Sequence, residues 1–231
     1  MKILGIIGGI APGSTIEYYR LLIEGWRQRM PAKGYPPVII NSIDLDRLLA
    51  MVGARAFGAL SEYLLDEIQR LARAGAQLAL LASNTPHVVF DTLRERSPLS
   101  LISIVEATCS AARALGLRRP GLIGTRFTMQ GSFYPEVFSG HGMTLLTPDE
   151  GEQAFIHDKY LGELVNGVFS SQTRDRILAI AQRMRNELGM DGLVLGGTEL
   201  PLLLRADAHD GMPLLDTTKI HVDAALARML S

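Results

Sequence analysis

The stretch LALLASNTPHVVF, from Leu78 to Phe90, is an apolar run that breaks into small and hydroxyl residues before a segment of helical character. A second stretch, GLVLGGTELPLLL from Gly192 to Leu204, repeats this pattern 114 positions later and aligns Ser83 with Gly197. Continuous apolar runs of this kind are typical of parallel strands that are buried on both faces. The repeat therefore predicts two similar halves, with a cleft between them as the working site.

An earlier pair of segments supports the same division, because GIIGG begins at Gly5 and GLIGT at Gly121, an offset of 116. Short apolar runs alternate with longer segments of helical spacing, which predicts a three-layer α/β architecture. The expected strands are residues 3–8, 37–43, 78–83, 101–105, 121–125, 143–147, 192–197 and 213–217. The expected helices are residues 14–29, 54–74, 104–115, 159–168, 174–188 and 218–230.

Composition narrows the classes of function. The 231 residues are 47% hydrophobic and carry a formal net charge of -1, so a nucleic-acid partner, which requires clustered Lys and Arg, is not expected. The first apolar run is too short and too rich in glycine for a membrane span, and it lacks the flanks of a signal peptide. We therefore expect a cytoplasmic protein with no membrane partner. The single cysteine, Cys109, lies in an alanine-rich helical segment and is expected to be a structural thiol.

Polar residues gather where the predicted strands end. In open parallel sheets, ligands bind beyond the carboxyl ends of strands, near helix N-termini that favour anions. The candidates are Ser83, Asn84, Thr85, Thr125, Thr198 and Glu199. Their alternative role is to cap helices. The opening GIIGGIAPGS lacks the G-x-G-x-x-G spacing of dinucleotide-binding loops, so no nucleotide cofactor is expected.

These segments resemble the aspartate/glutamate racemase family, where they typically read C-N-T-x-H and G-C-T-E-L, with the two cysteines facing each other across the substrate. Here they are SNTPH from Ser83 and GGTEL from Gly196, so both cysteine positions are vacant. The resemblance runs over nearly the whole chain, including GIIGGIAPGSTIEYY and GLIGTRFTM. It implies two Rossmann-like lobes with pseudo-twofold symmetry, each a mostly parallel sheet flanked by helices. We expect residues 1–98 plus 216–231 in one lobe and 99–215 in the other.

The resemblance also implies a ligand: a small amino acid or dicarboxylate, bound without a cofactor by a homodimeric isomerase. Arg47 is the expected carboxylate ligand, because a guanidinium can make two parallel hydrogen bonds to a carboxylate. An ion pair with Asp44 or Asp46 is the alternative for this side chain, and Arg126 is a second candidate. The remaining substrate-binding candidates are Asn84, Thr85, Thr125 and Thr128, with Thr198 contributing a further hydroxyl.

Catalysis is where the chain departs from the family. Racemisation needs a base on one face of the α-carbon and an acid on the other. Serine needs a neighbouring base to act and glycine has no side chain, so the two-thiol mechanism is unavailable to Ser83 and Gly197. We expect these two positions, with Thr198 and Glu199, to form a catalytic region with non-standard residues. His87 either pairs with Ser83 or is a capping or packing histidine.

Two alternatives remain open: a catalytically silent ligand-binding homologue, and a different carbanion chemistry, such as that of a decarboxylase or isomerase, in the same pocket. Family members often carry a basic residue after the E-L-x-x-G stretch. Here that stretch leads into VFSS from Val168, which has no charge and hints at a different distal group on the substrate. The five histidines are scattered without metal-ligand spacing, so no metal site is expected.

Overall fold

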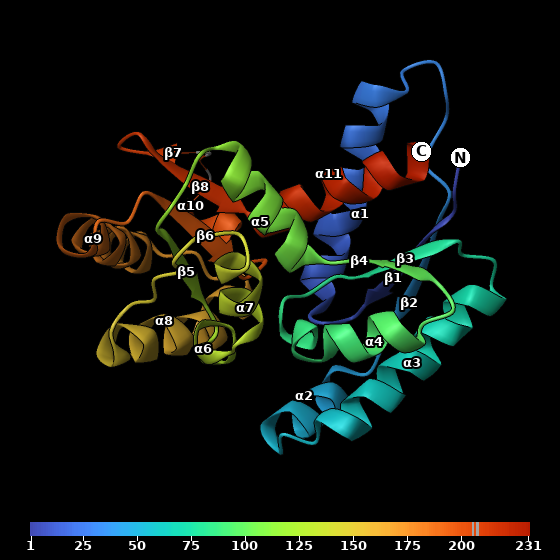
Figure 1. Ribbon diagram of the computed structural model, residues 1–231, viewed down its shortest axis with the longest axis horizontal. Coiled ribbons are helices and arrows are strands. Elements are labelled where there is room, and N and C mark those ends of the chain that lie inside the picture. Colours follow the sequence, from blue (N-terminus) through green and yellow to red (C-terminus); the bar gives the residue numbers. More distant parts are fainter. Residues whose placement is uncertain (205, 207) are drawn as a thin grey trace. The chain divides into compact units, whose positions relative to one another are not determined.

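The structure is a computed structural model that describes residues 1–204, 206 and 208–231. The chain forms two compact units, one of Met1–Ile104 with His221–Ser231 and the other of Val105–Ile220. The boundaries predicted from the sequence fall after residues 98 and 215. In each unit, helices flank a mostly parallel sheet (Figure 1), which confirms the predicted α/β class.

The first unit contains a parallel sheet of order β2-β1-β3-β4. Its strands are β1 (Leu4–Gly8), β2 (Val38–Ser42), β3 (Leu78–Leu81) and β4 (Ser100–Ile102). Its helical elements are α1 (Pro12–Arg29), α2 (Leu45–Gly53), α3 (Phe57–Arg73), the short 3-10 helix η1 (Thr85–Val89), α4 (Phe90–Arg96) and most of α11 (Thr217–Leu230). Every residue of β1 and β3 is buried, as their uninterrupted apolar sequences require.

The second unit has the strand order β5-β6-β8-β7, in which only β7 runs antiparallel to its neighbour. Its strands are β5 (Pro120–Gly124), β6 (Gly192–Gly196), β7 (Ala208–His209) and β8 (Met212–Asp216). Its helical elements are α5 (Ile104–Ala114), α6 (Arg126–Gln130), α7 (Phe133–Ser139), α8 (Glu150–Gly162), η2 (Leu164–Asn166), α9 (Ser171–Leu188) and α10 (Leu200–Leu204).

The predicted strand at residues 143–147 is wrong, because only Leu146 pairs, through a single parallel bridge to Gly121. Pro148 follows closely and has no N–H with which to continue a ladder. Gly121 also pairs with Leu193 of β6, so Leu146 must lie along the opposite edge of β5. This bridge occupies the place that β2 has beside β1, and the two units therefore share one topology.

Two predicted helices are also corrected. The helix expected over 54–74 begins at Phe57, and α2 precedes it as a separate helix whose N-cap, Asp44, accepts a hydrogen bond from the backbone N–H of Arg47 at 3.1 Å. The helix expected over 159–168 is the end of α8 followed by η2. Gly167 closes η2 at a φ of 74°, a left-handed conformation that a helix interior cannot adopt.

His221 ties α11 to the first unit. Its Nε2–H donates to the Ile102 carbonyl at 2.9 Å, which leaves Nδ1 to accept from the Tyr18 hydroxyl at 2.8 Å. Burial lowers the pKa of His221 to about 4, so the ring is neutral at pH 7. A single side chain thus connects α11 with both α1 and β4.

Glycines allow β5 and β6 of the second unit to end in close contact. A Cβ on Gly124 would lie 2.6 Å from the backbone oxygen of Gly196, and a Cβ on Gly196 would lie 3.0 Å from the backbone oxygen of Ile123. Because backbone atoms of a paired strand cannot move aside cheaply, these positions require glycine.

We expect Gly124→Ala to lower the free energy of unfolding by about 1–3 kcal/mol, the usual cost of overpacking a core. Gly58→Ala is the matched control, because a Cβ at this position in α3 meets nothing within 4 Å. Alanine there should raise the free energy of unfolding by up to about 1 kcal/mol. Urea unfolding of both variants measures the difference, and equal stabilities would contradict the close contact at Gly124.

Candidate functional site

The first polar group lies at the carboxyl end of β3. Ser83, Asn84 and Thr85 come one residue after the end of the strand, and Asn84 is buried, whereas the other two are half-buried. The 3-10 helix η1 begins at Thr85, with Pro86 in its first turn, where a missing N–H costs nothing. All three predicted residues therefore lie on one short loop past a buried strand, which is where ligands of parallel sheets bind.

His87 holds this loop in place. Its Nδ1–H donates to the Ser83 carbonyl at 3.0 Å, and its Nε2 accepts from the backbone N–H of Ile104 at 3.2 Å. The ring stacks on Phe90 with centroids 4.9 Å apart, and burial lowers the pKa of His87 to about 3. Both ring nitrogens are therefore bonded to the backbone, so His87 is a packing histidine and not a base for the Ser83 hydroxyl.

Arg47 lies in the first turn of α2 and is exposed. Its guanidinium stacks over the ring of Tyr63, with the central carbon 4.2 Å from the ring centroid. The Tyr63 hydroxyl accepts a hydrogen bond from the backbone N–H of Asp44 at 3.2 Å, which holds the ring. Within the described residues no ion pair joins Arg47 to Asp44 or Asp46, so its charge is available to a ligand.

In the second unit, Thr125 follows β5 and caps α6. Its Oγ1 accepts from the backbone N–H of Thr128 at 3.3 Å and lies 3.2 Å from the Thr128 hydroxyl. The structure thus brings together two predicted residues, Thr125 and Thr128, although Thr128 is 1% exposed. The side chain of Arg126 is exposed, and its backbone N–H donates to Nδ1 of His157 at 3.3 Å.

The end of β6 carries a third polar group, which is also buried. Thr198 donates to Oε2 of Glu199 at 2.8 Å, and the hydroxyl of Tyr160, from α8, donates to the same oxygen. A Cβ on Gly197 would lie 2.4 Å from the Tyr160 ring and 2.7 Å from its hydroxyl oxygen. The phenol therefore fills the space that any side chain at position 197 would need.

Comparison with known proteins matches residues 7–225 to the family model of Asp/Glu/hydantoin racemases. The chain belongs to this family. A crystal structure of a candidate Asp/Glu racemase from Yersinia pestis is similar to it, with 30% identity, a TM-score of 0.92 and 100% of both chains covered. So is an aspartate racemase homologue from Pyrococcus horikoshii OT3, with 29% identity, a TM-score of 0.87 and the same coverage. The broad-specificity amino-acid racemase RacX of Bacillus subtilis is 20% identical over 93% of this chain and 92% of its own length.

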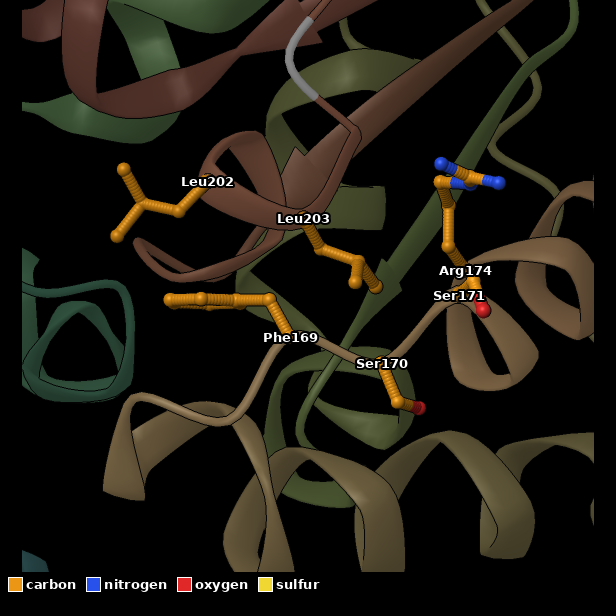
Figure 2. Close-up of a pocket in the computed structure, with 6 residues that line it drawn as sticks. All are labelled: Phe169, Ser170, Ser171, Arg174, Leu202 and Leu203. Carbon is orange, nitrogen blue, oxygen red and sulfur yellow. The ribbon is translucent and has the colours of Figure 1, made fainter.

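This racemase-family chain has a pocket of about 320 Å³ within the second unit. Its lining residues are Phe169, Ser170, Ser171, Arg174, Leu202 and Leu203. In Figure 2, Leu203 lies between Phe169 and the first turn of α9, which carries Arg174. The uncharged segment that departs from the family pattern, VFSS, therefore supplies half of this lining.

Other expectations concern groups outside these sites. Cys109 is buried in α5, and burial raises the pKa of its thiol, which confirms that it is packed in a helix. Across the part of the chain that is described, no three His, Cys, Asp or Glu side chains cluster as metal ligands would. No helix among these residues is long and apolar enough to cross a membrane.

Sequence reasoning missed two aromatic residues, Tyr63 and Tyr160. Tyr63 lies on α3 and contacts Arg47 of the preceding helix, whereas Tyr160 lies on α8, distant in sequence from Gly197. Each is typical of a core aromatic at helical spacing. Only the packing of α3 and α8 against the sheets brings them to Arg47 and Gly197. The functional roles of the residues predicted from the sequence stay predictions, as does a shared cleft.

The two neutral histidines make stability dependent on pH. We expect the free energy of unfolding to fall as the pH drops from 6.5 towards 4, because His87 and His221 bind protons in that range only when the chain is unfolded. Each contributes about 1.4 kcal/mol per pH unit to the slope. Urea titrations at several pH values measure it.

The variants His87→Gln and His221→Gln should each lower the pH dependence of the free energy of unfolding by the contribution of one histidine. This holds even if a variant is less stable than the wild type at neutral pH. His141→Gln serves as the control, because His141 is exposed. Equal slopes in all variants would mean that neither histidine is kept neutral by burial.

Proposed function

We propose that this chain binds a small amino acid or dicarboxylate and acts on it as a cofactor-independent isomerase of the racemase type. The observation that carries the proposal is the presence of hydroxyl and amide groups past the carboxyl ends of β3, β5 and β6, three strands in which every residue is buried. The names of similar proteins, an aspartate racemase homologue and a broad-specificity amino-acid racemase, support amino acids as the ligand class. We further propose a cytoplasmic homodimer.

Arg47 is the proposed ligand of the α-carboxylate. Stacking on Tyr63 restricts the guanidinium plane, so less conformational entropy is lost when it forms a bidentate pair with a carboxylate. Asn84, Thr85, Thr125 and Thr128 are proposed to bind the remaining polar atoms, and two of them, Thr125 and Thr128, already contact each other.

Ser83 and Gly197 are the proposed catalytic positions that have lost the thiols of the family. Ser83 offers a hydroxyl after β3, and next to Gly197 the hydroxyl of Thr198 donates to the carboxylate of Glu199. The pocket beside Phe169 supports a distal substrate group that combines an apolar part with a hydrogen-bonding end.

A ligand-binding protein without turnover is the second candidate. One observation favours it: His87, the histidine nearest to Ser83 in sequence, has both ring nitrogens bonded to the backbone. A serine without a neighbouring base is a weak nucleophile and a weak base. Binding would then persist with no exchange of the substrate's α-proton.

We expect Arg47→Ala to weaken binding of aspartate or glutamate by about 1.5–3 kcal/mol, the range for a hydrogen bond to a charged group. A thermal-shift screen of both enantiomers of each amino acid identifies the tightest binder, because a ligand of the folded state raises the melting temperature. Isothermal titration calorimetry then compares the variant with the wild type.

Arg73→Ala is the control. Arg73 is exposed in the last turn of α3, which leads into the amino end of β3 and thus lies away from the proposed site. Its replacement should leave the affinity unchanged. If Arg47→Ala also binds with wild-type affinity, Arg47 is not the carboxylate ligand.

A further inference from the structure

Three polar side chains form a buried network at the carboxyl end of β6. Tyr160, Thr198 and Glu199 are 6%, 7% and 8% exposed. Two hydroxyl groups, from Tyr160 and Thr198, donate to one carboxylate oxygen of Glu199. Enclosing a carboxylate costs free energy unless its hydrogen bonds are satisfied, and this network satisfies them at the edge of the sheet where ligands bind.

Gly197 and Tyr160 are complementary in shape. A Cβ at position 197 would lie 2.4 to 2.8 Å from three atoms of the Tyr160 side chain, the hydroxyl oxygen among them. Any residue other than glycine would therefore displace the ring. The loss of a side chain from the β6 loop is matched by a phenol from α8 that brings its own ionisable group to the same point.

We propose that Tyr160 and Glu199 form the acid–base pair on this face of the site, an inference that rests on the proposed function. In the forward step the phenol oxygen takes the α-proton, while the phenol proton moves to Oε2 of Glu199. The C–H bond breaks and its electron pair stays on the substrate as an enolate. In the reverse step Tyr160 returns a proton to the carbon and Glu199 returns one to Tyr160, so the pair is regenerated.

The charge state of the phenol fits this role. Burial, together with the negative charge of Glu199, raises the pKa of Tyr160 well above its usual range. The phenol therefore keeps its proton at neutral pH and cannot act as a free phenolate. Glu199, which already accepts its hydrogen bond, is the group to which that proton can move.

The pair serves one face only. Both ring nitrogens of His87 bond to the backbone, so His87 does not serve Ser83 as a base, and an intermediate formed at Tyr160 regains its proton mainly from Tyr160. The expected outcome is that the α-proton of one enantiomer exchanges with retention of configuration faster than the amino acid racemises. This proposal replaces the expectation that position 197 offers no group for proton transfer.

The test follows deuterium uptake from D2O into D- and L-aspartate and D- and L-glutamate by mass spectrometry, with chiral chromatography on the same samples. The wild-type chain should label one enantiomer of one of these amino acids. Tyr160→Phe and Glu199→Gln should each slow labelling by at least about 100-fold, the lower range for general acid–base catalysis, while calorimetric affinity stays within a few-fold of wild type.

Tyr134→Phe is the matched control, since it removes the hydroxyl of another buried tyrosine of the second unit and should not slow labelling. If the wild type labels a substrate and both Tyr160→Phe and Glu199→Gln do so equally fast, the inference is overturned and the proposed function stands. Binding without labelling by the wild type also overturns the inference and favours the silent binding protein. If the wild type neither binds nor labels any of the four amino acids, the proposed function itself is refuted.

Discussion

Both faces of β1, β3, β5 and β6 are buried, and this constraint determines where polar chemistry can occur in the molecule. A strand covered by helices on both sides cannot present a polar side chain along its length without burying it. Polar residues are confined to the turns where the strands end. There the first turn of the next helix begins, and the positive end of its dipole favours a small anion.

Different hydrogen bonds hold the loops after β3 and β6. After β3, the ring of His87 bridges the Ser83 carbonyl and the Ile104 N–H, so the hydrogen bonds run to the backbone. After β6, they run among the side chains of Tyr160, Thr198 and Glu199. A neutral, fully engaged imidazole supports structure, whereas a carboxylate that holds two hydroxyl protons can exchange them. The two repeats thus use one topology for unequal chemistry.

The strands and the larger helices follow from the sequence because their signals are local: uninterrupted apolar runs and helical spacing over ten or more residues. Residues 143–147 mislead for the same reason, since MTLLT has the composition of a strand but only Leu146 forms a β-bridge. The short helices α6, α7 and α10 span less than two full turns and leave no clear periodicity. Of the site, the polar strand ends are predictable from position alone. The stacking of Arg47 on Tyr63 and the insertion of Tyr160 beside Gly197 are not, because each depends on how a helix lies against a sheet.

In each unit the last strand is followed by a helix that belongs mainly to the other unit, and this has a consequence for synthesis of the chain. The helix that follows β4, α5, belongs almost wholly to the second unit, and most of the helix that follows β8, α11, belongs to the first. On the ribosome, residues 105–220 are therefore complete before His221 emerges to meet Tyr18 and the Ile102 carbonyl. Domains usually fold in the order in which they are made. Here the half that is translated second can close its core first, while the half translated first still lacks a helix.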